Sequence, residues 1–173
     1  MGKRIIAQRR GRGTSTYSAH SHRWSIKVKH RPYDNLEKES SISGTIVDLV
    51  HCKGHTAPIA LIKYENGEAA YIYAPIGIKV NDIVHSGFKA KPTAGSTLPI
   101  KNIPEGSRIY NIESKPADGG SLVRASGTSA RVSTITEKGI TIIMPSKKKK
   151  IINPLCRATI GKIAGSGKKE KPI

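Results

Sequence analysis

GSTLPIKNIPEGSRIYNIESKPADGGSLVRASGTSAR, residues 95–131, contains two short apolar runs, 98–103 and 109–112, separated and followed by turn residues. The prolines of this stretch fix φ and lack an amide hydrogen, so they favour turns and strand edges. We therefore expect short strands and tight turns here, with a loop at the end of the stretch.

The second half of this stretch combines glycines with well-spaced cations. Gly119, Gly120 and Gly127 supply backbone that adopts positive φ and approaches another surface closely. Small hydroxyl side chains lie around them, together with three cations, Lys115, Arg124 and Arg131. The stretch shows no nucleophile paired with a base. We interpret it as a loop that docks on a phosphate backbone.

Composition points to a polyanionic partner. The 173 residues carry 30 Lys and Arg against 12 Asp and Glu, a formal charge of +18. Such an excess implies nucleic acid, and no apolar run is long enough to span a membrane. The hydrophobic fraction of 36% suits two small barrels better than one large core. Two cysteines without a signal-like segment indicate a cytoplasmic protein.

The first 38 residues form a basic arm. Nine cations precede the first acid, Asp34. We expect the arm, up to about residue 35, to be disordered in the free protein and extended against RNA, because it shows no apolar period. A merely solubilising tail is the alternative. The arm residues predicted to contact RNA are Arg4, Arg9, Arg10, Arg12, His20, His22, Arg23, Trp24 and Lys27, the ring side chains by stacking.

Residues 39–90 predict a first barrel of the oligonucleotide-binding (OB) type. Its short β-branched runs lie at 42–51, 58–64, 68–74 and 82–85. Asn66-Gly67 between the second and third runs indicates a hairpin, because both residues tolerate positive φ. We expect Gly44 to weaken or bulge the first strand.

A linker at 86–96 precedes a second all-β unit, 91–163, whose size suits an SH3-like barrel. Its strands are expected at 130–136, 139–145, 148–153 and 155–161, with a tight hairpin at Glu137-Lys138. Residues 164–173 resemble a basic linker, with Lys168 and Lys169 as further RNA contacts. The lysine run at 147–150 is either a phosphate patch or a solvated hairpin edge. We favour phosphate contact by Lys147, Lys148 and Lys149.

Enzymatic and metal chemistry find little support in the sequence. His51, Cys52 and His55 are potential ligands, but structural zinc needs four ligands, usually as two close pairs, and a second cysteine pair is missing. Phosphate-loop, metalloprotease and hydrolase motifs are absent. We expect no catalytic residue, no metal and no cofactor.

The segments TLPIKNIPEGSRIYNIESKPADGGSLVRASGTSARV and LCRATIG closely resemble the family of the large-subunit ribosomal protein numbered two. The predicted first barrel resembles the OB-type domain of that family, in the segments GTIVDLVH and APIALIKYENGEAAYIYAPIGIKVNDIVHSG. The arm is more similar to the archaeal and eukaryotic version than to the bacterial one. The resemblance implies RNA contacts by Lys115, Gly119, Gly120, Arg124, Gly127, Thr128 and Arg131, and by Arg157.

The resemblance also implies a function. It is that of a structural component that binds large-subunit ribosomal RNA near the subunit interface and supports assembly of the peptidyl-transferase region and subunit association. Partners would be that RNA, neighbouring ribosomal proteins and the small subunit, with no homo-oligomer. Family members continue into a long basic extension, so we expect a longer natural protein. The alternative is a free RNA-chaperone factor, for which Tyr64, Tyr71 and Tyr73 would offer stacking platforms.

Overall fold

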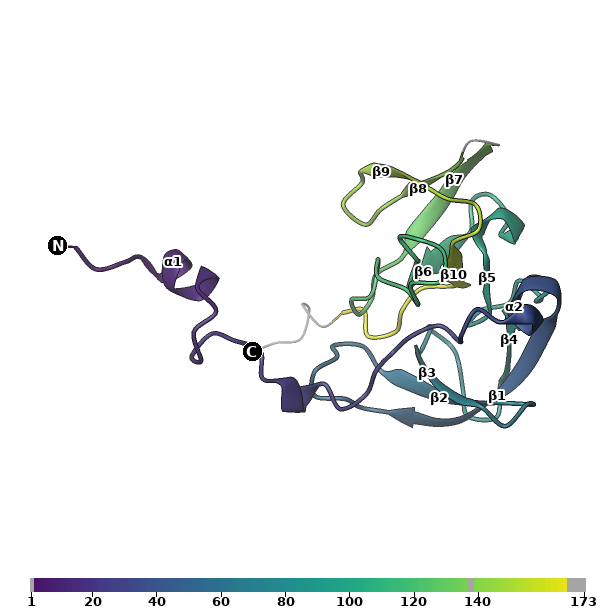
Figure 1. The fold of residues 1–173 in the computed structure, drawn as a ribbon, viewed down its shortest axis with the longest axis horizontal. Coiled ribbons are helices and arrows are strands. Elements are labelled where there is room, and N and C mark those ends of the chain that lie inside the picture. Colours follow the sequence, from purple (N-terminus) through teal and green to yellow (C-terminus); the bar gives the residue numbers. More distant parts are fainter. Residues whose placement is uncertain (1, 137–138, 168–173) are drawn as a thin grey trace.

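A computed structural model describes residues 2–136 and 139–167. They form an all-β molecule of two barrels, with a projecting arm at the N-terminus (Figure 1). The helices are short: α1 (Ile6–Gly11), α2 (Asn35–Glu39) and 3-10 turns at Ser21–Arg23 and Ile100–Asn102. No helix in the described part of the chain is long and apolar enough to cross a membrane.

The first barrel is built on β1 (Ser41–Val50), β2 (Ile59–Tyr64), β3 (Ala69–Tyr73) and β4 (Ile83–Gly87), in the order β3-β2-β1-β4. The strands of this unit pair antiparallel. The hairpin predicted at Asn66-Gly67 is confirmed, since Lys63 pairs with Ala69 across it and Gly67 has a φ of 84°. The strands predicted at 58–64 and 68–74 are therefore confirmed.

The bulge in β1 lies at Val47, where the register with β2 shifts between Ile46 and Asp48. The prediction of a bulge at Gly44 is wrong. Gly44 pairs in register with Tyr64, and a Cβ there would lie 2.8 Å from a ring carbon of Tyr64. Glycine is needed at this position because a core tyrosine packs over the strand.

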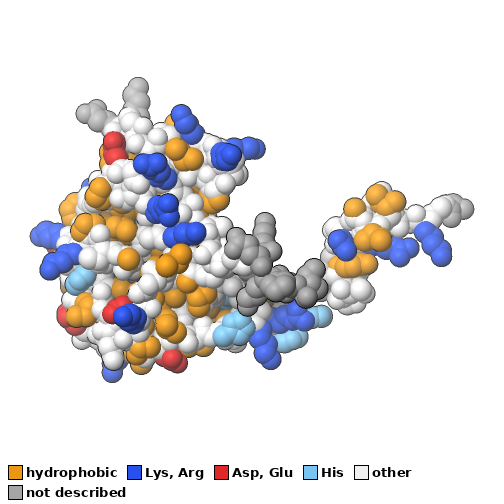
Figure 2. Space-filling view, turned by 180° about the vertical axis from the view of Figure 1, so that it is seen from behind, with side chains coloured by type: hydrophobic (Ala, Val, Ile, Leu, Met, Phe, Trp, Pro, Cys, Tyr) orange, Lys and Arg blue, Asp and Glu red, His pale blue; other side chains and the backbone are white. Residues whose placement is uncertain are grey.

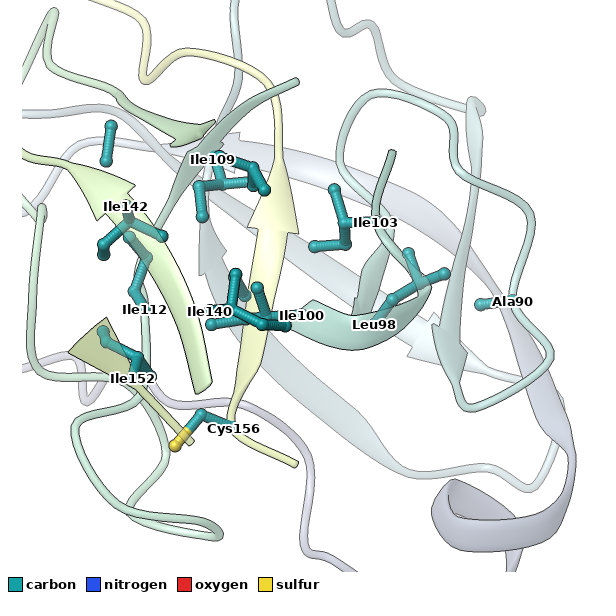
Figure 3. Packing of buried hydrophobic residues seen from close by; sticks show 13 residues of the cluster. Ala90, Leu98, Ile100, Ile103, Ile109, Ile112, Ile140, Ile142, Ile152 and Cys156 are labelled. Carbon is teal, nitrogen blue, oxygen red and sulfur yellow. The ribbon is translucent and has the colours of Figure 1, made fainter. Parts of the chain in front are cut away.

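The second barrel contains six strands in the order β5-β10-β6-β7-β8-β9. Their bounds are β5 (Thr97–Pro99), β6 (Arg108–Tyr110), β7 (Ala130–Thr136), β8 (Gly139–Ile143), β9 (Lys149–Ile152) and β10 (Arg157–Ile160). β7 and β8 pair up to Thr136 and Gly139, and the turn predicted at 137–138 lies outside the described residues. A cluster that includes Ile100, Ile109, Ile140 and Ile142 fills this barrel (Figure 3).

The two barrels share a continuous sheet and a buried boundary. The predicted linker begins inside β4, because Ser86 pairs in parallel with Thr97 of β5. Tyr110 donates its hydroxyl hydrogen to the carbonyl of Tyr73 at 2.9 Å, and both rings are buried. The chain after β10 also returns to the first barrel, where the amide of Ala164 donates to the carbonyl of Ala74. The barrels are therefore packed together.

The basic arm is folded in its second part, which corrects the expectation of disorder up to residue 35. Residues 2–25 are exposed, but Val28 and His30 are 2% and 6% exposed. In residues 26–31, here called the strap, Val28 and His30 are buried and Ile26 is half-buried, whereas Lys27 and Lys29 are exposed. This alternation is the period of a half-buried strand, so the strap packs against the body.

Candidate RNA-binding surface

The glycine-rich loop is held by two carboxylates of its own segment. Glu113 accepts hydrogen bonds from the amides of Ala117 and Gly119, both at 3.2 Å. Asp118 accepts from the amide of Gly120 at 2.8 Å and from those of Ser114 and Lys115. Partial burial alone would raise the pKa of Asp118, but these three backbone bonds hold it below its ordinary value. The loop is therefore preformed.

The surface that these glycines approach is the protein itself. A Cβ on Gly119 would touch the side chain of Lys29 in the strap, and one on Gly120 would overlap the amide of Asn111. Gly127 packs in the same way against Ser166. Internal packing therefore explains why these positions are glycines, and RNA contact by Gly119, Gly120 and Gly127 stays a prediction.

Arg157 does not reach the surface. Its residue is 1% exposed, and its guanidinium donates to Glu113 at 2.8 Å and to the carbonyl of Arg31 at 2.7 Å. A second buried carboxylate, Glu37, lies 3.6 Å from it. Direct RNA contact by Arg157 is therefore excluded by this geometry, and the side chain joins the second barrel to the strap and α2.

Arg124 lies where the strap and both barrels meet. Its Nε donates to the hydroxyl of Tyr73 at 3.0 Å, and its Nη2 donates to the carbonyl of Val28 at 3.0 Å. The guanidinium carbon lies 5.3 Å from the centre of the Tyr73 ring. Because the side chain is only half-buried, it presents an oriented positive charge to solvent.

A groove runs beside this arginine, with a volume of about 540 Å³. Its lining comes from the arm just before the strap, from the strap, from the turn after β1, from β3 and from the glycine-rich segment: Trp24, Ile26, Lys27, Val28, Lys29, Gly54, His55, Thr56, Tyr73 and Arg124. Trp24 is half-exposed and meets the His55 ring edge-on, 4.8 Å between centres. The groove therefore brings together two predicted RNA contacts of the arm, Trp24 and Lys27, and one of the loop, Arg124.

The other predicted cations lie apart from the groove. Lys115 and Arg131 are exposed, as are Lys147, Lys148 and Lys149 at the turn between β8 and β9. Thr128 donates its hydroxyl to the carbonyl of Ala125. Arg4, Arg9, Arg10, Arg12, His20, His22 and Arg23 are exposed along the arm, and the rings of His20 and His22 stack at 5.4 Å. Figure 2 shows Lys, Arg and His side chains gathered where the arm leaves the body. Lys168 and Lys169 lie outside the described residues.

Comparison with known proteins gives the chain a family. Residues 2–86 match the family model described as Ribosomal Proteins L2, RNA binding N-terminal domain, and residues 93–173 match Ribosomal Proteins L2, C-terminal domain. Proteins named large ribosomal subunit protein uL2 from Methanothermobacter thermautotrophicus and Methanobrevibacter smithii are 51% and 50% identical over 173 residues. Each alignment covers 100% of this chain and 72% of the relative. The chain belongs to the ribosomal protein L2 family.

Of the three potential ligands after β1, Cys52 and His55 are packed in the interior and His51 is exposed. Cys52 is buried, with its sulfur 3.4 Å from the carbonyl oxygen of Arg23, and His55 lies between the rings of Trp24 and Tyr73. Within residues 2–136 and 139–167, no three His, Cys, Asp or Glu side chains are placed to hold one metal ion.

Lys29 lines the groove but was not among the predicted RNA contacts. His55 was expected in a turn that faces RNA or water, and Tyr73 was a stacking platform only under the free-factor alternative. The alternation of Lys27 and Lys29 with apolar neighbours was the available signal for Lys29, since it marks a strand with one charged face. No local signal places His55 or Tyr73 beside the strap and Arg124. Their place at the groove depends on how the second barrel packs on the first.

Proposed function

We propose that this member of the L2 family holds large-subunit ribosomal RNA along the arm and in the groove between the barrels. As a family member it is a structural, RNA-binding component of the large ribosomal subunit in the cytoplasm, and not an enzyme. The observation that carries the proposed placement is the set of cations around the groove. Lys27 and Lys29 are exposed on the strap, and Arg124 is oriented by Tyr73.

Proximity to the subunit interface, support of the peptidyl-transferase region and contacts with neighbouring ribosomal proteins belong to the same proposal. They rest on the family resemblance. The free RNA-chaperone alternative loses part of its basis, since Tyr64 and Tyr73 are 5% and 3% exposed and form no open stacking platform on the sheet.

Salt-dependent binding tests the placement. The change is Lys27→Ala with Lys29→Ala, and the matched control is Lys38→Ala with Lys63→Ala, two lysines that are also exposed but lie away from the groove lining. Each lost phosphate contact lowers the slope of log affinity against log salt by about one. For large-subunit RNA, we expect the magnitude of this slope to fall by about two in the strap variant and to stay at the wild-type value in the control. Equal slopes would contradict the placement.

Sedimentation tests the role. A structural component remains stoichiometric with large subunits after a high-salt wash. A free factor would appear at the top of the gradient.

A further inference from the structure

Trp24 is fixed on the body although it belongs to the exposed part of the arm. The backbone of Gly54 packs against its ring so closely that a Cβ there would lie 2.7 Å from Cδ2 of the indole. The His55 ring meets it at an interplanar angle of 78°. Trp24 nevertheless remains 49% exposed. A large aromatic surface is thus held in one place and left open to solvent.

The groove beside the indole has the size and lining of a site for a flat ligand. Its volume of about 540 Å³ falls in the range of roughly 300–1,000 Å³ that is typical of small-ligand sites. Trp24 supplies the exposed aromatic wall, and the mostly buried rings of His55 and Tyr73 complete the lining with Ile26 and Val28. Tyr73 is held by hydrogen bonds at its hydroxyl and its carbonyl, so the site is preformed.

The charge of the groove selects an anion. Three of its lining residues, Lys27, Lys29 and Arg124, are cations, and the lining contains no acid. A ligand that offered only phosphates would bind to exposed cations, as along the arm, and would need no aromatic cavity. A ligand that fits the whole groove has a flat ring next to negative charge, which is the chemistry of a nucleotide.

We infer that the groove receives a single unpaired RNA base. The base leaves its helix and lies against the open face of Trp24, while Lys27 and Lys29 neutralise the phosphates on either side. Every base has a π-face, so such a contact is tolerant of sequence. This inference rests on the proposed RNA binding and adds to it a specific readout of an unstacked nucleotide.

The chain carries its own reporter for this contact, because Trp24 is the only tryptophan. The full chain is titrated with three short RNA hairpins of one sequence: one with a bulged adenosine, one with an abasic bulge and one fully paired. We expect the bulged adenosine to quench Trp24 emission and to bind about tenfold more tightly than the other two, within the roughly five- to hundredfold range of base–aromatic stacking. All three hairpins should still bind through their phosphates.

Variants assign the effect to the indole, with labelled RNA as the readout. Trp24→Ala should remove the preference for the bulged adenosine, Trp24→Phe should keep part of it, and Tyr17→Ala, an exposed aromatic elsewhere on the arm, should leave it intact. Thermal melting of each variant checks the fold. Equal binding of all hairpins without quenching overturns the inference and leaves the proposed function standing, whereas failure of every hairpin to bind overturns the proposed function itself.

Discussion

Arg157 of β10 and Glu113 of the glycine-rich segment form an ion pair inside the molecule, 2.8 Å between Nη2 and Oε1, with 2% and 0% of their side chains exposed. The same guanidinium reaches the strap through the carbonyl of Arg31. Glu37 of α2 completes the cluster, and burial raises its pKa above the ordinary value, against the opposing effects of Ser86, Arg157 and Arg31. One arginine therefore joins the strap and α2 to the second barrel.

Replacing Arg157 with Met should destabilise the protein by about 3–5 kcal/mol, because Glu113 would remain buried without its cation and Glu37 would keep only Arg31, at 3.8 Å. Urea unfolding measures the loss. Arg108→Met, an exposed arginine on β6, is the control and should change stability by less than about 0.5 kcal/mol. The variant that also carries Glu113→Gln should be less unstable than the two single losses added together. A change below about 1 kcal/mol for Arg157→Met would contradict this account.

Gly120→Ala should be more destabilising than Gly67→Ala. Both glycines have positive φ, 94° and 84°, so each alanine carries backbone strain of about 1 kcal/mol or more. Only at Gly120 does the new Cβ also meet a neighbour, with Cγ of Asn111 at 2.8 Å, while Gly67 faces open space. Overpacking should add about 1–3 kcal/mol at Gly120. Thermal melting compares the two, and equal losses would leave strain as the whole cause.

Stability should fall between pH 7 and pH 5 because of His30. Burial, reinforced by the charge of Arg157, lowers the pKa of this histidine from 6.5 to about 4. In that window the unfolded chain binds a proton that the folded protein does not, so acidification favours unfolding, by on the order of 1–2 kcal/mol.

Glu37, with its raised pKa, acts in the opposite direction as the pH falls. The measurement is therefore the slope of the unfolding free energy against pH, compared between the wild type and His30→Gln. His51→Gln, at an exposed histidine, is the control. If His30→Gln keeps the wild-type slope, the buried histidine is not the cause.

Hydrogen exchange should divide the arm near residue 26. The amide of His30 donates to the carbonyl of Gly119 at 3.0 Å beneath a buried side chain, so it should exchange slowly in the free protein. Residues 12–20, which are exposed, should exchange within seconds. Mass spectrometry of peptides from the two regions measures this difference. Fast exchange at 28–31 would mean that the strap is not bound to the body without RNA.

Sequence alone was sufficient for the local features. Asn66-Gly67 predicts its hairpin because both residues tolerate the positive φ that tight turns use, and in the structure Gly67 adopts it. The alternation of apolar and polar residues predicts the strands. The excess of cations over acids indicates the class of partner, since so large a net charge repels itself in a compact protein and favours binding to a polyanion. The all-β fold followed from these signals and from the family resemblance.

Tertiary structure decided which charges are available. Arg124 and Arg157 are the same residue type in similar loop-rich sequence, yet one is open to solvent and the other is buried between Glu113 and Glu37. Sequence could not separate them, because the partners of Arg157 are distant in the chain. Glu113 lies 44 residues before it, and Glu37 lies about 120 residues before it. The groove beside Trp24 arises in the same way, from the packing of one barrel on the other with the strap between them.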